Sequence, residues 1–196
     1  MDSVRGHSSQ PAIAERLVIY LVGGAPRAGK SIVSQQIAFE LGIGWVSTDL
    51  LVELLRVKDE KGVRVEWNAA PEAILSNAEW FFPYLERFVW GVSTQAANYL
   101  IEGVGFLPAQ VAQLSEQYPI RTVFLGCSQM TLEKLDQFPG RSPGYGYLPE
   151  ALRRRIVHDV PHFGASLFGK NASVSGSRMW IWLPIFRNVR VTLSRC

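Results

Sequence analysis

The chain has 196 residues, of which 47% are hydrophobic and 19% are charged, a composition typical of a globular protein and not of a disordered one. Its length suits one domain with one well-formed core. The net charge of +3 comes from 20 Lys and Arg against 17 Asp and Glu, spread along the chain without a basic tract, so we expect no nucleic-acid partner.

The cysteines and the apolar runs favour a cytoplasmic protein. Cys127 and Cys196 fit no metal or redox spacing, which favours free thiols in a reducing compartment. We expect residues 1–14 to form a disordered leader, because they lack an apolar run typical of a signal sequence. The run Met179–Phe186 is broken by Pro184 and is far shorter than the roughly 20 residues that span a bilayer, so we expect no membrane partner.

Strand and helix patterns alternate along residues 15–163. The predicted strands are short apolar runs, the first of them typical of a parallel strand buried on both faces, and they cover 17–22, 43–46, 98–102 and 120–125. The predicted helices lie between and after them, at 30–41, 48–57, 74–97, 108–117, 130–138 and 149–158. This order predicts an α/β three-layer sandwich, with a central parallel sheet and helices on both faces.

Local signals refine these elements. Gly42 is expected to end the first helix, and Thr48 or Asp49 to cap the second. Pro83 should kink one helix or divide two, and the glycines and prolines of residues 139–147 predict a loop.

Residues 164–196 are harder to interpret. We treat them as an irregular C-terminal segment, in which the alternating pattern of Val189–Leu193 is a candidate for a last strand.

The first predicted strand runs into a phosphate-binding motif. Residues 24–31 match GxxxxGK[ST], between a buried strand and a helix as this motif requires. The glycines let backbone N–H groups turn toward phosphates at a helix N-terminus, Lys30 brings a charge to the β and γ phosphates, and Ser31 offers a hydroxyl to Mg²⁺. The residues predicted to bind the nucleotide are Gly24, Ala25, Pro26, Arg27, Ala28, Gly29, Lys30, Ser31 and Ile32. The motif therefore predicts the fold of a P-loop NTPase. It also predicts that the chain binds ATP together with Mg²⁺.

Two carboxylates follow the second and third predicted strands. Asp49 could accept the proton of an acceptor hydroxyl or help to hold the metal through water, or it could only cap a helix. Glu102 ends an apolar strand and is followed by Gly103 and Gly105, which makes it a candidate metal residue beside Ser31. The alternative for Glu102 is a solvated charge at a strand end.

The helix at 149–158 contains Arg153, Arg154 and Arg155, just after the predicted loop. Arginines on such a lid would neutralise the charge that develops during phosphoryl transfer, although only one or two can face the site. A solvated basic face is the alternative. His158 and His162 have no ligand partners at metal spacing.

These motifs resemble the nucleotide-kinase-like branch of the P-loop proteins, and more narrowly the 2-phosphoglycerate kinase-like group. The resemblance covers residues 17–160 and rests on Gly-Gly-Ala-Pro-Arg-Ala-Gly-Lys-Ser at 23–31, Val-Ser-Thr-Asp at 46–49 and Ile-Glu-Gly-Val at 101–104. It implies ATP-dependent transfer of a phosphoryl group to a small metabolite. In this resemblance Lys30 belongs to the ATP site, Asp49 is the acid on the acceptor side, and Arg154 or a neighbour is a lid arginine.

Three functions are open at this point. The chain is a small-molecule kinase with Lys30, Asp49 and Arg154 as its catalytic residues, or an ATP-binding regulatory module, or a simple NTPase in which Asp49 or Glu102 orients water. The sequence leaves the acceptor and the oligomeric state open.

Overall fold

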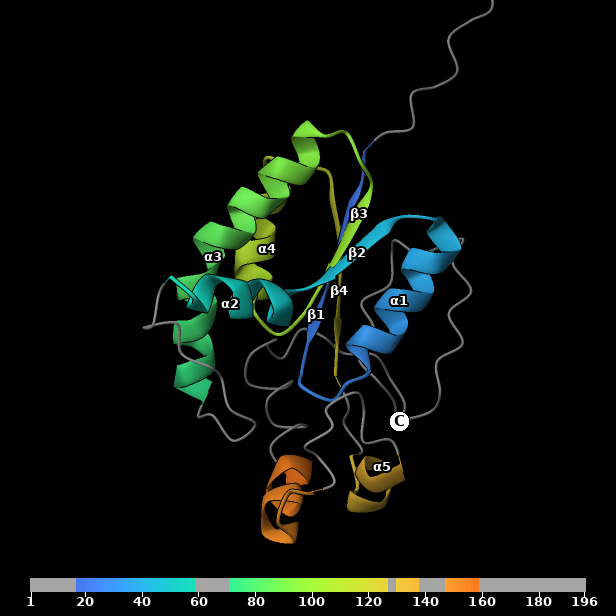
Figure 1. Cartoon of the computed structure of the whole chain (residues 1–196), viewed down its shortest axis with the longest axis vertical. Helices are drawn as coiled ribbons and strands as arrows, with labels where there is room; N and C mark the ends of the chain where they lie inside the picture. The colour runs from blue at the N-terminus through green and yellow to red at the C-terminus, as the bar shows by residue number, and fades with distance from the viewer. Residues whose placement is uncertain (1–16, 59–70, 127–129, 138–146, 159–196) are drawn as a thin grey trace, which may run out of the picture.

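The computed structural model describes residues 17–58, 71–126, 130–137 and 147–158. A four-stranded parallel sheet lies at its centre (Figure 1). The strands are β1 (Ile19–Gly24), β2 (Gly44–Ser47), β3 (Tyr99–Glu102) and β4 (Ile120–Leu125). Their order in the sheet is β2-β3-β1-β4. Our predictions for residues 1–14, 139–146 and 164–196 lie outside the described residues.

The register of the sheet aligns the carboxyl ends of its strands. Val22 of β1 pairs with Glu102 of β3, and Ser47 of β2 pairs with the same Glu102. On the other side of β1, Gly24 pairs with Leu125 of β4. The residues that follow the strands therefore emerge at one edge, where parallel α/β sheets bind their ligands.

Helices cover both faces of the sheet, as predicted for a three-layer sandwich. They are α1 (Lys30–Leu41), α2 (Thr48–Arg56), α3 (Pro71–Thr94), α4 (Pro108–Ser115), α5 (Leu132–Gln137) and a helix at 150–158. Figure 1 shows α1 on one side of the sheet and α2, α3 and α4 on the other. The α/β P-loop fold expected from the sequence is therefore confirmed.

Each face of the sheet has its own hydrophobic core, because successive side chains of a strand point to opposite faces. Tyr20 and Val22 of β1 belong to a first core, which we call the α1-side core and which also holds buried residues of the P-loop, α1, α5 and the helix at 150–158. Ile19 and Leu21 belong to a second core, the α3-side core, built with α3, β3 and α4. The inner side of α2 packs against this second core through Leu51, Val52 and Leu55.

One local prediction was wrong. Ser47, and not Thr48 or Asp49, caps α2, since its side chain accepts a hydrogen bond from the backbone N–H of Asp49 at 3.3 Å. The reason is that β2 extends to Ser47 and the helix begins one residue earlier than a cap at Thr48 would allow. Of the two outcomes predicted for Pro83, the division into two helices is excluded, because α3 runs without interruption from Pro71 to Thr94.

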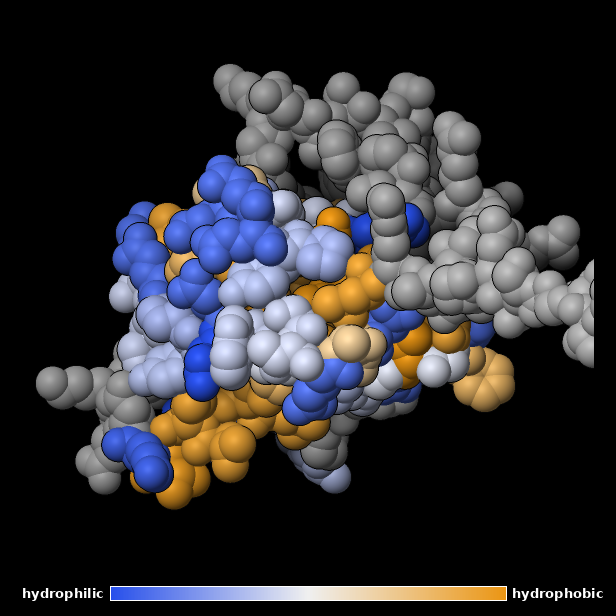
Figure 2. Space-filling view, turned by 90° about the horizontal axis from the view of Figure 1, so that it is seen from above, coloured by the Kyte–Doolittle hydropathy of each residue, from blue (hydrophilic) through white to orange (hydrophobic). Residues whose placement is uncertain are grey.

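The outward side of α2 is apolar as well. Leu50, Leu54 and Val57 are 63%, 70% and 81% exposed. Figure 2 shows hydrophobic residues gathered at the lower left, the side on which α2 lies in Figure 1. Within the described ranges, no helix combines the length and the apolar character needed to cross a membrane.

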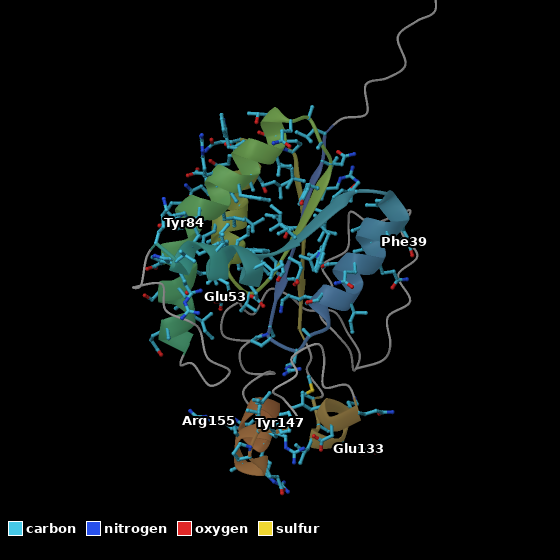
Figure 3. The ribbon with its side chains drawn as sticks, in the orientation of Figure 1. Phe39, Glu53, Tyr84, Glu133, Tyr147 and Arg155 are labelled. Atoms are coloured by element: carbon cyan, nitrogen blue, oxygen red, sulfur yellow. The ribbon has the colours of Figure 1, made fainter. Side chains whose placement is uncertain are left out.

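The α3-side core predicts a large effect of truncation at Phe81, which is completely buried. Phe81→Ala should lower the free energy of unfolding by about 3–5 kcal/mol, because it removes a large side chain and leaves a cavity. Urea denaturation followed by circular dichroism measures this change. Phe39→Ala is the matched control, since Phe39 on α1 is 88% exposed and lies at the outer side of the molecule (Figure 3). The control should change stability by less than about 0.5 kcal/mol.

Candidate nucleotide site

The segment between β1 and α1 forms a turn around the carboxyl end of β1. Arg27 and Gly29 have left-handed backbones, with φ of 62° and 78°. Gly24 has a φ of 126°, and a Cβ at this position would lie 2.0 Å from the carbonyl oxygen of Leu125. Only glycine fits there, because the chain passes so close to β4 that Ala25 N–H donates to the same carbonyl at 2.8 Å.

Helix α1 begins at the end of this turn with Lys30. Gly29 is its N-cap, and no side chain caps the helix. The first backbone N–H groups of α1, together with the positive end of its dipole, therefore point toward the turn, an arrangement suited to an anion. The Lys30 side chain is buried, and its Nζ donates to the carbonyl oxygen of Ala25 at 2.8 Å, which folds it back over the turn.

Glu102 lies beside this turn at the end of β3. It is only 2% exposed, which excludes the alternative of a solvated charge at a strand end. The hydroxyl of Ser31 donates to its Oε1 at 2.9 Å. This bond joins the first turn of α1 to the end of β3, so that the two predicted metal residues are in direct contact.

Burial shifts the pKa of two groups in opposite directions. Removal from water lowers the pKa of Lys30 from its ordinary 10.5, and the negative charges of Glu102 and Asp49 oppose this shift. Burial raises the pKa of Glu102 from its ordinary 4.5, against the attraction of Lys30 and hydrogen bonds from Ser31 and Ser47. The three charged side chains therefore interact at one edge of the sheet.

Asp49 is the exposed member of this group. It lies in the first turn of α2, close after the end of β2, and its backbone N–H donates a hydrogen bond to the hydroxyl oxygen of Ser47. An exposed carboxylate at the sheet edge can reach a ligand, whereas the buried Glu102 can act only on what lies next to Ser31.

The donor set fits Mg²⁺. Ser31 and Glu102 offer oxygen atoms, the ligands that this ion prefers, and both lie next to the turn between β1 and α1. Among residues 17–58, 71–126, 130–137 and 147–158, no group of three or more His, Cys, Asp or Glu side chains could hold a metal ion. A magnesium ion here would therefore take its remaining ligands from phosphates and water.

The arginine-bearing helix lies at the same end of the molecule. Ile156 of this helix and Leu135 of α5 are buried in the α1-side core together with Ala25 and Ala28 of the turn. Figure 3 shows Arg155 and Tyr147 at the end of the molecule toward which β1 runs, on the same side as Glu133 of α5. Two helices, α5 and the helix at 150–158, therefore pack against the turn at the position expected for a lid.

Two of the arginines are engaged in ion pairs. Arg153 donates to Asp136 of α5 at 2.6 Å and so joins the two helices. Arg154 is exposed and pairs with Glu150 on its own helix at 2.5 Å. Of the two, Arg153 has the more buried side chain.

The structure brings together most of the residues that the sequence suggested. Lys30, Ser31, Asp49 and Glu102 converge at the turn, whereas Ile32 is 63% exposed on the outer side of α1. Ser47 and Thr48 were not suggested as site residues, although both are buried at this edge. The signal that could have found them is the run Ser-Thr-Asp directly after a strand.

Comparisons with known proteins give distant structural likenesses. No protein-family model matches the chain, and no curated protein matches it. A candidate kinase from Chloroflexus aurantiacus is similar over 72% of this chain and 75% of its own, with 15% identity and a TM-score of 0.44. Shikimate kinase from Acinetobacter baumannii, solved with shikimate, is similar over 84% and 87%, with 19% identity and a TM-score of 0.39. At this level of similarity, the function must be inferred from the geometry of the site itself.

The raised pKa of Glu102 predicts a pH-dependent effect of Glu102→Gln. The carboxyl group of Glu102 holds its proton more tightly in the folded state than in the unfolded state. The free energy of unfolding therefore falls as the pH rises from about 4.5 through the raised pKa. A glutamine is neutral and buries no charge at this position. Glu102→Gln should therefore melt at a higher temperature than wild type at neutral pH but not near pH 4.5. Thermal unfolding at both pH values measures the difference, with Glu79→Gln on the exposed side of α3 as control. A gain that does not depend on pH would show that the charge of Glu102 is not the cause.

Proposed function

We propose that the chain is an ATP-dependent small-molecule kinase that works in the cytoplasm. The observation that carries this proposal is the hydrogen bond between Ser31 and the buried Glu102, next to a buried Lys30. Such a site suits a triphosphate with its metal ion, and Asp49 adds an exposed carboxylate on the acceptor side.

The proposed reaction needs positioning more than covalent chemistry. The turn at 24–31 would hold the phosphates by backbone N–H groups, with Lys30 beside the β and γ phosphates. An acceptor oxygen would form a bond to the γ phosphorus as the bond to ADP breaks, and Asp49 would take the proton of the acceptor hydroxyl. Ser31 and Glu102 are the residues that would hold a Mg²⁺ ion, which would neutralise part of the phosphate charge when bound.

The acceptor is proposed to be a small metabolite that carries a hydroxyl, a carboxylate or a phosphate, with 2-phosphoglycerate as the first compound to test. This choice rests on the resemblance of the motifs at 23–31, 46–49 and 101–104. The alternatives are a regulatory module that only binds ATP and a simple NTPase. The exposed Asp49 beside a buried metal residue favours the kinase, because a module that only binds ATP needs no second carboxylate at this edge.

Transfer from ATP to a panel of phosphorylated and hydroxylated metabolites tests this function. Lys30→Ala should lower the rate of transfer by about 100-fold or more, because a charge aimed at the transferred group is lost. Asp49→Ala should lower transfer by about 100-fold to 10,000-fold while ATP affinity stays close to wild type. Lys58→Ala is the control for Lys30, since Lys58 is exposed just after α2. Equal turnover in all four proteins would remove both residues from the mechanism.

Arg154 is proposed as a lid arginine, and its neighbours Arg153 and Arg155 are the competing candidates. If the helix at 150–158 acts as a lid, at least one of Arg153→Ala, Arg154→Ala and Arg155→Ala should lower transfer by about 100-fold without an equal loss of ATP binding. Arg121→Ala on β4 is the control, because this arginine is exposed away from the helix. Wild-type transfer in all three variants would leave the helix as a solvated basic face.

A further inference from the structure

Thr48 lies between two residues already described, Ser47 and Asp49, and is the first residue of α2. Its side chain is completely buried. In the described part of the chain, its hydroxyl oxygen is buried without a hydrogen-bond partner. A buried hydroxyl without a partner is unfavourable for folding, so what favours Thr48 at this edge of the sheet is the packing of its side chain.

The Thr48 side chain fits against the loop that follows β3. A Cβ at Gly103 would lie 1.7 Å from Thr48 Oγ1, 2.8 Å from its Cβ and 3.0 Å from its Cγ2. A Cβ at Gly105 would lie 3.3 Å from the same Oγ1. Thr48 therefore occupies the space that a side chain at Gly103 would need, and the two glycines are what allow its close approach.

This contact connects the two carboxylates of the site. Thr48 immediately precedes Asp49, and Gly103 immediately follows Glu102. Ser47 and Glu102 are paired in the sheet, but the backbone ladder ends at these residues. Past this point, the contact of Thr48 with Gly103 holds the start of α2 against the loop after β3.

We propose that Thr48 is a positioning residue whose side-chain shape sets the spacing between the carboxylates of Glu102 and Asp49. This inference rests on the proposed function, because the spacing matters only if these carboxylates serve a metal and nucleotide site. Thr48 acts through its neighbours Asp49 and Gly103. Since its hydroxyl has no partner among the described residues, shape and not hydrogen bonding is its contribution.

The test compares ATP affinity in excess Mg²⁺ with ATP affinity in EDTA, both by isothermal titration calorimetry. The increase in ATP affinity caused by Mg²⁺ should be smaller in Thr48→Ala than in wild type by a factor of about 10 or more. This is the usual effect of removing a residue that orients a metal site. Its affinity in EDTA should equal that of wild type, because the turn at 24–31 is intact. Thr48→Val keeps the shape and should match wild type in both conditions. Thr48→Ser, which removes only the methyl group, should show the same loss in milder form and serves if Thr48→Ala does not fold.

A second threonine separates this role from a general loss of structure. Thr122 of β4 is partly buried and donates to the carbonyl oxygen of Leu21 at 3.1 Å. Thr122→Ala should lower the melting temperature but leave the effect of Mg²⁺ on ATP affinity unchanged. The proposal is overturned if Thr48→Ala keeps the full effect of Mg²⁺, or if Thr48→Val loses it. A wild-type protein that binds no ATP in either condition would instead refute the kinase proposal, and with it the role of Thr48.

Discussion

A carboxylate and an ammonium group are buried together at one edge of the sheet, and the arrangement of the other elements follows from this. Burying Glu102 and Lys30 is unfavourable unless partners replace the lost water. The partners are the hydroxyl of Ser31, the carbonyl oxygen of Ala25 and the mutual attraction of the two charges. Each of them is present only because β1, β3 and α1 meet at this edge in the observed register.

This arrangement gives a physical meaning to the turn between β1 and α1. A turn that only reversed the chain would not need to bury a lysine or to leave its helix without a side-chain cap. Here both features leave positive charge and free helix-end donors directed at the same small region. This concentration of positive charge is unfavourable without an anion, and apolar packing offsets it. Ala25 and Ala28 of the turn are completely buried and contribute to this packing.

The sequence predicted the parts of this site that depend on local rules. The turn at 24–31 follows from a motif whose residue types are set by backbone geometry, and β1 follows from the continuous apolar run Leu17–Val22. The cap of α2 was placed at Thr48 or Asp49 and not at Ser47, because Ser47, Thr48 and Asp49 are all good capping residues and only the pairing of Ser47 with Glu102 distinguishes them. The burial of Glu102 could not be predicted either, since it depends on contacts with Ser31, more than seventy residues away in the sequence.

The division of the interior into two cores separates the two halves of the site. The turn, α1 and the arginine-bearing helix are held by the α1-side core, while α2, which carries Asp49, rests on the α3-side core. Only the thin layer of strands is common to both. The packing of α2 and α3 is therefore largely separate from the packing of the turn and α1. Under the proposed kinase function, the side of the site carried by α2 could change during evolution to accept a new metabolite while the ATP side keeps its packing.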